Sequence, residues 1–197
     1  MTAFPIRDLF PFRTIPRSII FLVVSIVLLF LMPVRSMGIP EMFTAIQEGD
    51  CQKVRQLIRL DPRMVDARSV NSSSPLHWAV KIQDVMLVKM LLECGADVNR
   101  QTTNGTTPMM LAAEAGSFEI VEMLNVPGIE LNMKTRRGWT ALHFAANLGC
   151  CQTVEFLMLR GAEVNAMTKN GTTPLALARV NNRREAVGLI QAYGGLE

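Results

Sequence analysis

The 197-residue sequence lacks the motifs that mark common enzyme classes. Its two histidines, His77 and His143, do not stand near a serine or cysteine in a recognised nucleophile pattern. There is no glycine-rich phosphate loop and no His-Glu metal signature. The four cysteines do not have the paired spacing of a zinc site. We therefore expect no catalytic residues, no cofactor and no metal ligands, and a protein that is not an enzyme.

The longer part of the chain also lacks an excess of charge. Residues 1–40 hold four arginines and one aspartate, a net charge of +3, which equals the net charge of the whole chain. Residues 41–197 are therefore neutral. The sequence pI of about 8.8 comes from the N-terminal segment. This basic pI gives no reason to expect nucleic acid as a partner.

Long apolar runs are confined to the region near the N-terminus. Residues 19–32 contain a single polar side chain, Ser25. An apolar run of about 10–14 residues is short for a membrane span and fits the core of a signal peptide. We expect residues 1–36 to be a signal peptide or signal anchor with its apolar core at 18–34, and any cleavage to fall before Met37.

Three alternatives for this segment lead to different locations. Arginines precede the apolar run and favour a cytoplasmic N-terminus. A cleaved signal would export the remainder to a periplasmic, lumenal or extracellular space. An uncleaved anchor would give a single-pass membrane protein whose only membrane contact is through residues 18–34. If translation starts at Met37, the protein is cytoplasmic.

The rest of the chain repeats with a period of 33 residues. Equivalent positions are held by Pro75, Pro108, Ala141 and Pro174, and twenty residues later by Gly95, Gly128, Gly161 and Gly194. Self-similarity at this period is typical of a solenoid. Such units cannot bury their apolar faces alone and are stable only when stacked.

Each unit has the signals of two helices. In one of them Thr107 is a candidate N-cap, Pro108 occupies the first helical position, and Gly116 permits the chain to reverse. The sequences Ser74-Pro75-Leu76-His77 and Thr140-Ala141-Leu142-His143 stand at the same position. This pattern resembles the ankyrin repeat. The resemblance implies an all-α solenoid of helix-turn-helix units with short hairpin loops, here preceded by a hydrophobic N-terminal helix.

The register divides residues 37–197 into five units. A capping repeat is expected at about 40–70, with Pro40 opening its first helix. Regular repeats follow at about 71–103, 104–136, 137–169 and 170–197.

In this register Cys51 and Cys151 occupy an apolar position, so we expect buried side chains there. With helices about 8–10 Å apart, the two cysteines are roughly 25–30 Å from one another, and we expect free thiols even in an oxidising compartment.

Some motif positions are predicted to be structural. The resemblance implies that both histidines hydrogen-bond a neighbouring turn, and that Asn99, Asn132 and Asn165 do the same in the linkers. Met110 and Ala176 replace the motif histidine, which removes a hydrogen bond from each of those repeats. Pro127 is expected to shorten the second helix of the third unit, so the middle of the stack is predicted to be its weakest part.

The resemblance implies a protein-binding scaffold that uses its concave face. The residues expected to contact a partner are Arg68, Lys81, Gln101, Asn104, Glu114, Lys134, Arg136, Arg137, Trp139, Asn147, Lys169 and Asn170. Lys134, Arg136 and Arg137 cluster beside Trp139, which suggests that the partner is an acidic protein. The alternative is a solvated basic turn with the tryptophan lying over its neighbour.

The sequence leaves two further functions open. The domain could be a self-associating structural module of a membrane protein complex, or a soluble cytosolic adaptor if translation starts at Met37. One tryptophan and three cations on a neutral domain do not indicate nucleic-acid binding.

Overall fold

A computed structural model describes residues 34–196 of the chain. Contacts divide the chain into two units, Met1–Met37 and Gly38–Glu197. The predicted signal segment, with its hydrophobic helix, lies outside the described residues except at its last three positions. Within the described part, no helix is both long and apolar enough to cross a membrane.

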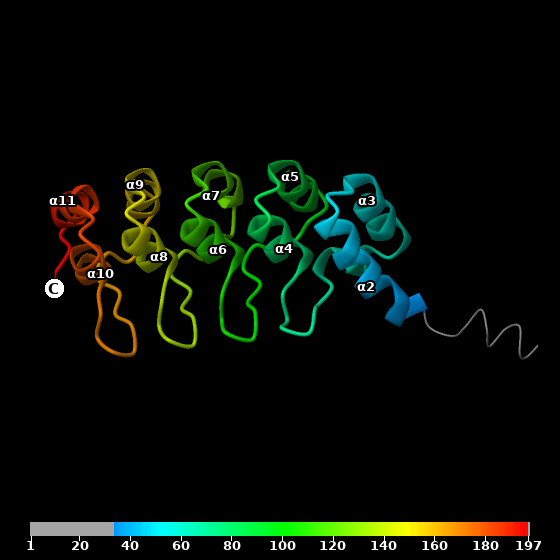
Figure 1. The fold of residues 1–197 in the computed structure, drawn as a ribbon, viewed down its shortest axis with the longest axis horizontal. Coiled ribbons are helices and arrows are strands. Elements are labelled where there is room, and N and C mark those ends of the chain that lie inside the picture. The colour runs from blue at the N-terminus through cyan, green and yellow to red at the C-terminus, as the bar shows by residue number, and fades with distance from the viewer. Residues whose placement is uncertain (1–33, 197) are drawn as a thin grey trace, which may run out of the picture. The chain divides into compact units, whose positions relative to one another are not determined.

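All regular structure in residues 34–196 is helical, and the helices come in pairs along the chain (Figure 1). The first pair is α2 (Val34–Gln47) and α3 (Cys51–Leu60), followed by the 3-10 helix η2 (Pro62–Asp66). The regular pairs are α4 (Pro75–Lys81) with α5 (Val85–Glu93), α6 (Pro108–Ala115) with α7 (Phe118–Leu124), α8 (Ala141–Leu148) with α9 (Cys151–Leu159), and α10 (Pro174–Val180) with α11 (Arg184–Ala192). This confirms the predicted all-α class.

The pairs stand side by side with their connecting loops all on one side (Figure 1). Helices α4, α6, α8 and α10 form an inner row next to the loops, and α5, α7, α9 and α11 form an outer row. The loops that precede the inner helices are here named L1 (67–74), L2 (100–107), L3 (133–140) and L4 (166–173). Loops and inner helices together form one continuous face of the repeat unit.

The inner helices begin at the predicted residues, and α6 and α8 end at the predicted glycines. The Thr107 hydroxyl accepts a hydrogen bond from the Met110 amide at 3.3 Å, and Pro108 takes the first helical position. At the other end, Gly116 and Gly149 have φ values of +71° and +83°. This left-handed conformation ends each helix and lets the chain reverse into the outer helix.

The core is a repeated layer of apolar side chains. Leu91, Leu124, Leu157 and Ile190 are equivalent residues of the outer helices, and all four are fully buried. Burial of one such side chain stabilises the fold by about 1.5–3 kcal/mol. Because each repeat buries this layer against the next repeat, the stack is stabilised by the interfaces between neighbours.

Two predictions about the capping repeat and the cysteines were wrong. Pro40 does not open a helix but lies inside α2, which begins at Val34. Proline fixes φ near the helical value, but inside a helix it removes one hydrogen bond and its ring crowds the carbonyl four residues earlier. Cys51 and Cys151 are half-buried rather than buried, because each begins an outer helix at its edge.

The predictions of free thiols and of a shortened helix in the third unit are confirmed. All four cysteines are free, and partial burial raises the pKa of the Cys51 and Cys151 thiols. Helix α7 has seven residues against nine in α9, which confirms the shortening that Pro127 predicted.

Candidate functional site

Main-chain hydrogen bonds join the tips of successive loops. One such bond connects each loop to the next, with an amide of the later loop donating to a carbonyl of the earlier one. The pairs are Thr103 N to Asn71 O at 3.0 Å, Arg136 N to Asn104 O at 2.8 Å, and Lys169 N to Arg137 O at 3.0 Å. The loops therefore form an edge that is connected through main-chain atoms.

Glycine is required where the loops approach one another. A Cβ at Gly138 would lie 2.8 Å from the Lys169 amide nitrogen, and one at Gly105 would lie 3.0 Å from the Thr135 Cα. Both glycines also have positive φ, +83° and +77°. Close backbone approach and left-handed conformation together explain glycine at these turns.

Each of the two histidines connects its own inner helix to the loop before that helix and to the loop of the next repeat. His77 Nδ1 accepts from the Ser74 amide at 3.2 Å, and its Nε2 donates to the Thr106 carbonyl at 3.0 Å. His143 repeats this arrangement with Thr140 and Thr172. Burial lowers the pKa of both imidazoles. The predicted structural role of the histidines is confirmed.

A second network joins the linkers that follow the outer helices. Asn132 donates from Nδ2 to the Gly161 carbonyl at 3.2 Å and accepts from the Glu163 amide at 2.7 Å. Asn99 and Asn165 make the same two bonds one repeat away on either side, which confirms their predicted role. These side chains are engaged in holding the stack together.

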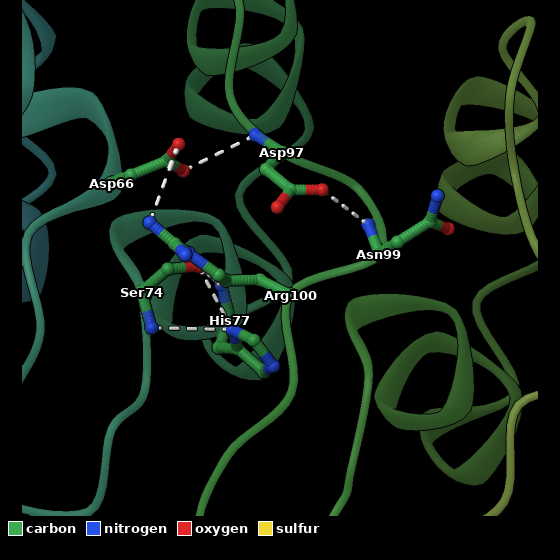
Figure 2. A network of polar contacts seen from close by, with 6 residues as sticks. All are labelled: Asp66, Ser74, His77, Asp97, Asn99 and Arg100. Carbon is green, nitrogen blue, oxygen red and sulfur yellow. Dashed lines mark hydrogen bonds and ion pairs between the residues drawn. The ribbon is translucent and has the colours of Figure 1, made fainter.

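In the capping repeat, aspartate takes the place of the linker asparagine, as Figure 2 shows. Asp66 Oδ1 accepts from the Asp97 amide at 3.2 Å, but an aspartate has no amide hydrogens to donate. Its other oxygen instead faces Arg100, whose guanidinium lies 3.7 Å away. The same figure shows Ser74 and His77 beneath this pair. This region is a polar junction between repeats.

Two hollows open on the face formed by the loops and inner helices. The first, of about 340 Å³, lies between L1, α4, L2 and α6, and Lys81 lines it. The second, of about 640 Å³, lies between L2, α6, L3 and α8. Half of the twelve predicted contact residues line the second hollow: Asn104, Glu114, Arg136, Arg137, Trp139 and Asn147.

Trp139 packs within the domain and also faces the second hollow. Its ring centroid lies 5.0 Å from that of Phe144 and 6.0 Å from that of His143, and the residue is half-buried. The tryptophan therefore lies over its neighbours, as the alternative interpretation held, while part of its ring remains available to a ligand.

The other predicted contact residues lie elsewhere. Gln101 is engaged structurally, because its amide donates to the Gly105 and Lys134 carbonyls at 3.0 and 3.3 Å. Lys134 lies 3.8 Å from the Glu163 carboxylate and lines neither hollow. Arg68, Lys169 and Asn170 are exposed on L1 and L4, also outside the hollows.

Sequence reasoning missed the apolar floor of these hollows. Trp78 and Leu111 line the first hollow, and Phe144 lines the second. The three residues are 33 positions apart and half-buried, one on each of α4, α6 and α8. The 33-residue period could have revealed these residues, because each of them directly follows the fourth residue of the four-residue motif that begins an inner helix.

The loops carry charge of one sign. L1 to L4 contain no aspartate or glutamate, and their charged residues are Arg68, Arg100, Lys134, Arg136, Arg137 and Lys169. Since residues 41–197 are neutral as a whole, the excess of acidic residues lies outside the loops. The loop edge is therefore the cationic edge of a neutral domain.

Comparison with known families identifies the fold. A profile described as ankyrin repeats (3 copies) matches residues 42–135 and 125–195. The chain belongs to the ankyrin-repeat family. Ankyrin repeats are in general non-catalytic modules that bind other proteins. No group of potential metal ligands occurs among the residues that the structure describes.

Individual relatives match only short stretches of the chain. The chain is 44% identical over 54 residues to the serine/threonine-protein kinase VIK of Arabidopsis thaliana, covering 27% of this chain and 12% of the kinase. It is 38% identical over 58 residues to palmitoyltransferase akr1 of Schizosaccharomyces pombe, covering 29% and 9%. It is 34% identical over 62 residues to the ankyrin repeat and SAM domain-containing protein 6 of Danio rerio, covering 32% and 8%.

These matches cover about a tenth of the length of each relative. Two of the relatives are enzymes by name, and their similarity to this chain is confined to the partial stretches given above. The similarity therefore supports the repeat architecture of this chain and does not extend to either enzymatic activity.

Proposed function

We propose that the repeat domain is a non-catalytic scaffold that binds an acidic protein through its second hollow. The observation that carries this proposal is the joint presence of Arg136, Arg137 and the exposed part of Trp139 in one hollow. Arginine and tryptophan are enriched among residues that dominate protein–protein binding energies. Neither arginine takes part in an ion pair with another residue of the 34–196 segment.

The expected energetics divide between charge and apolar contact. Exposed ion pairs stabilise by about 0.2–1 kcal/mol each, so two arginines supply specificity more than affinity. Burial of a partner side chain against Phe144 and Leu148 supplies the larger part, at about 25 cal/mol per Å² of apolar surface. The scaffold thus requires a partner that presents acidic and bulky apolar residues together.

A peptide-display selection against the immobilised full-length chain tests this function. Peptides rich in acidic and apolar residues should be enriched, and the Arg136→Ala/Arg137→Ala variant should lose at least tenfold in capture with an unchanged melting temperature. Arg59→Ala/Lys89→Ala removes two exposed cations from the outer surface and is the matched control. Equal loss in both variants, or no acidic enrichment, would contradict the proposal. Light scattering of the same preparation separates partner binding from self-association.

Arginine variants are preferable to Trp139→Ala as a first test. The Trp139 ring packs on Phe144, so truncation removes a stabilising contact as well as a candidate binding residue. A loss of binding in that variant would be accompanied by a lower melting temperature. The arginine side chains are exposed, and their removal leaves the packing intact.

Export or membrane tethering of this scaffold is also part of the proposal. It is supported by the apolar run at residues 19–32 and the arginines before it. N-terminal sequencing after cell fractionation tests it. A start at Met37 in an exported pool indicates cleavage, and an intact N-terminus in membranes indicates an anchor. A start at Met37 in cytosol would reject export and leave a cytosolic adaptor.

A further inference from the structure

The two hollows are parts of one groove. Thr106 and Glu114 line both of them, so they adjoin at the third repeat. The floor is formed by Trp78, Leu111 and Phe144, which follow one another from α4 through α6 to α8. The groove therefore crosses three repeats over a continuous half-buried apolar surface.

Charges along this groove alternate in sign. Lys81 stands in the first hollow, 5.5 Å above the Trp78 ring, Glu114 stands where the hollows meet, and Arg136 and Arg137 stand in the second. All four side chains are exposed, and no ion pair found within residues 34–196 uses any of them. An alternating row of unpaired charges selects a ligand with the opposite alternation.

The spacing of the repeats sets the spacing expected in a ligand. Neighbouring packed helices are about 8–10 Å apart. An extended chain advances about 3.3 Å per residue, so one repeat corresponds to about three residues of ligand. Charges that match three successive repeats would therefore fall at positions i, i+3 and i+6 of an extended segment.

We propose that the groove binds an extended peptide segment with an acidic, a basic and an acidic residue at i, i+3 and i+6. The acidic residues pair with Lys81 at one end and with Arg136 and Arg137 at the other. The central basic residue pairs with Glu114. This rests on the proposed function and adds that Glu114 determines specificity within the same groove.

The shape and the central carboxylate favour a peptide over other anionic partners. Hollows of about 340 and 640 Å³ receive individual side chains, whereas a flat anionic membrane would leave them empty. A nucleic acid or a uniformly acidic segment would bring negative charge against Glu114 at the middle of the groove. Such like-charge placement is destabilising and discriminates against those partners.

Three synthetic peptides with the full-length chain test the proposal. They carry glutamate at both flanking positions, apolar residues between, and lysine, glutamine or glutamate in the centre. Fluorescence anisotropy should give affinities in the order lysine, glutamine, glutamate, with about a fivefold loss per step, as expected for an exposed ion pair. Equal affinity of the three peptides for the unmodified chain would overturn the role of Glu114.

Charge variants at position 114 sharpen the test. Glu114→Gln should remove the preference among the three peptides, and Glu114→Lys should reverse it. Glu155→Lys, an equal charge change on the exposed side of α9, should keep the original order. An unaltered order in both position-114 variants would overturn the inference. If all three peptides bind the unmodified chain and Arg136→Ala/Arg137→Ala abolishes this binding, the proposed function would still stand. If no peptide binds, the proposed function and this inference would both be rejected.

Discussion

The second and fourth repeats carry a histidine at a position where the third and fifth repeats do not. In the first group a buried histidine joins its inner helix to the following loop, as His143 does with the Thr172 carbonyl at 3.1 Å. In the third repeat Met110 occupies this position, and its sulfur accepts only from the Thr107 amide of its own loop. Ala176 in the fifth repeat has no polar side-chain atoms. The comparison shows that one side chain decides whether an inner helix makes a hydrogen bond to the following loop.

The difference falls at the larger of the two hollows. Loop L3, which carries Arg136, Arg137 and Trp139, is the loop that the missing histidine of α6 would have fastened. It is held instead by the bond from the Arg136 amide to Asn104 and by the Gln101 side chain. The loop with the candidate binding residues thus has weaker support from α6 than L2 has from α4.

Removing a histidine should have the largest effect on the free energy of unfolding. His143→Ala leaves the buried Thr140 amide and the Thr172 carbonyl without their side-chain partner. Loss of buried hydrogen bonds of this kind costs about 2–3 kcal/mol. Chemical denaturation should show this loss in the free energy of unfolding of the chain. A change below 0.5 kcal/mol, on the order of an ordinary surface substitution, would contradict this assignment.

Acid should weaken the same two repeats. Burial lowers the pKa of His77 and His143 below the usual value of about 6.5. As pH falls below about 6.5, the unfolded chain binds protons that the folded chain does not, so stability decreases until the folded-state histidines titrate. These groups contribute no pH dependence above that range. Melting temperatures between pH 7.5 and 4.5 measure the effect, which should shrink in His143→Ala.

Introducing a histidine should reduce the difference. Met110→His places an imidazole behind L3, where its Nε2 could donate to the Trp139 carbonyl. One added buried hydrogen bond contributes about 1 kcal/mol. Denaturation should show this gain, and hydrogen exchange of L3 should slow. Unchanged exchange in a correctly folded variant would show that L3 is already held as firmly as L2.

The fourth repeat has a weakness of its own that partly offsets its histidine. The Thr153 hydroxyl is buried in α9 without a hydrogen-bond partner in the described part of the chain. Equivalent positions hold Leu87, Ile120 and Ala186. Thr153→Val should therefore stabilise the chain by about 0.5–1 kcal/mol, measured by denaturant titration. Thr153→Ser keeps the hydroxyl and serves as the control, and stabilisation by both would refute the explanation.

The fold was predictable because the same physical requirement recurs every 33 residues. The capping threonines, the first-position prolines and the left-handed glycines each appear several times in register, so a local signal at Thr107 is supported by those at Thr140 and Thr173. The capping repeat has no such support, and there Pro40 was misread as a helix start. A signal that occurs only once, such as Pro40, has no equivalent in another repeat to support it, and packing can then override the local preference of the residue.

The groove was only partly predictable. Loop positions such as Arg136 and Arg137 follow directly from the register. Whether a polar side chain faces the groove or bonds to a neighbouring loop depends on contacts between repeats, and Gln101 and Lys134 turned out to be engaged in such contacts. The apolar floor of Trp78, Leu111 and Phe144 went unnoticed because half-buried residues on a helix resemble core residues in sequence.

The loop-tip bonds use main-chain atoms alone, and this has an evolutionary consequence. Substitutions other than proline at residues such as Asn104, Arg136 or Arg137 leave the main-chain donors and acceptors of these bonds in place. Selection can therefore change the side chains that this edge presents by altering a few codons, while the architecture that carries them is inherited intact.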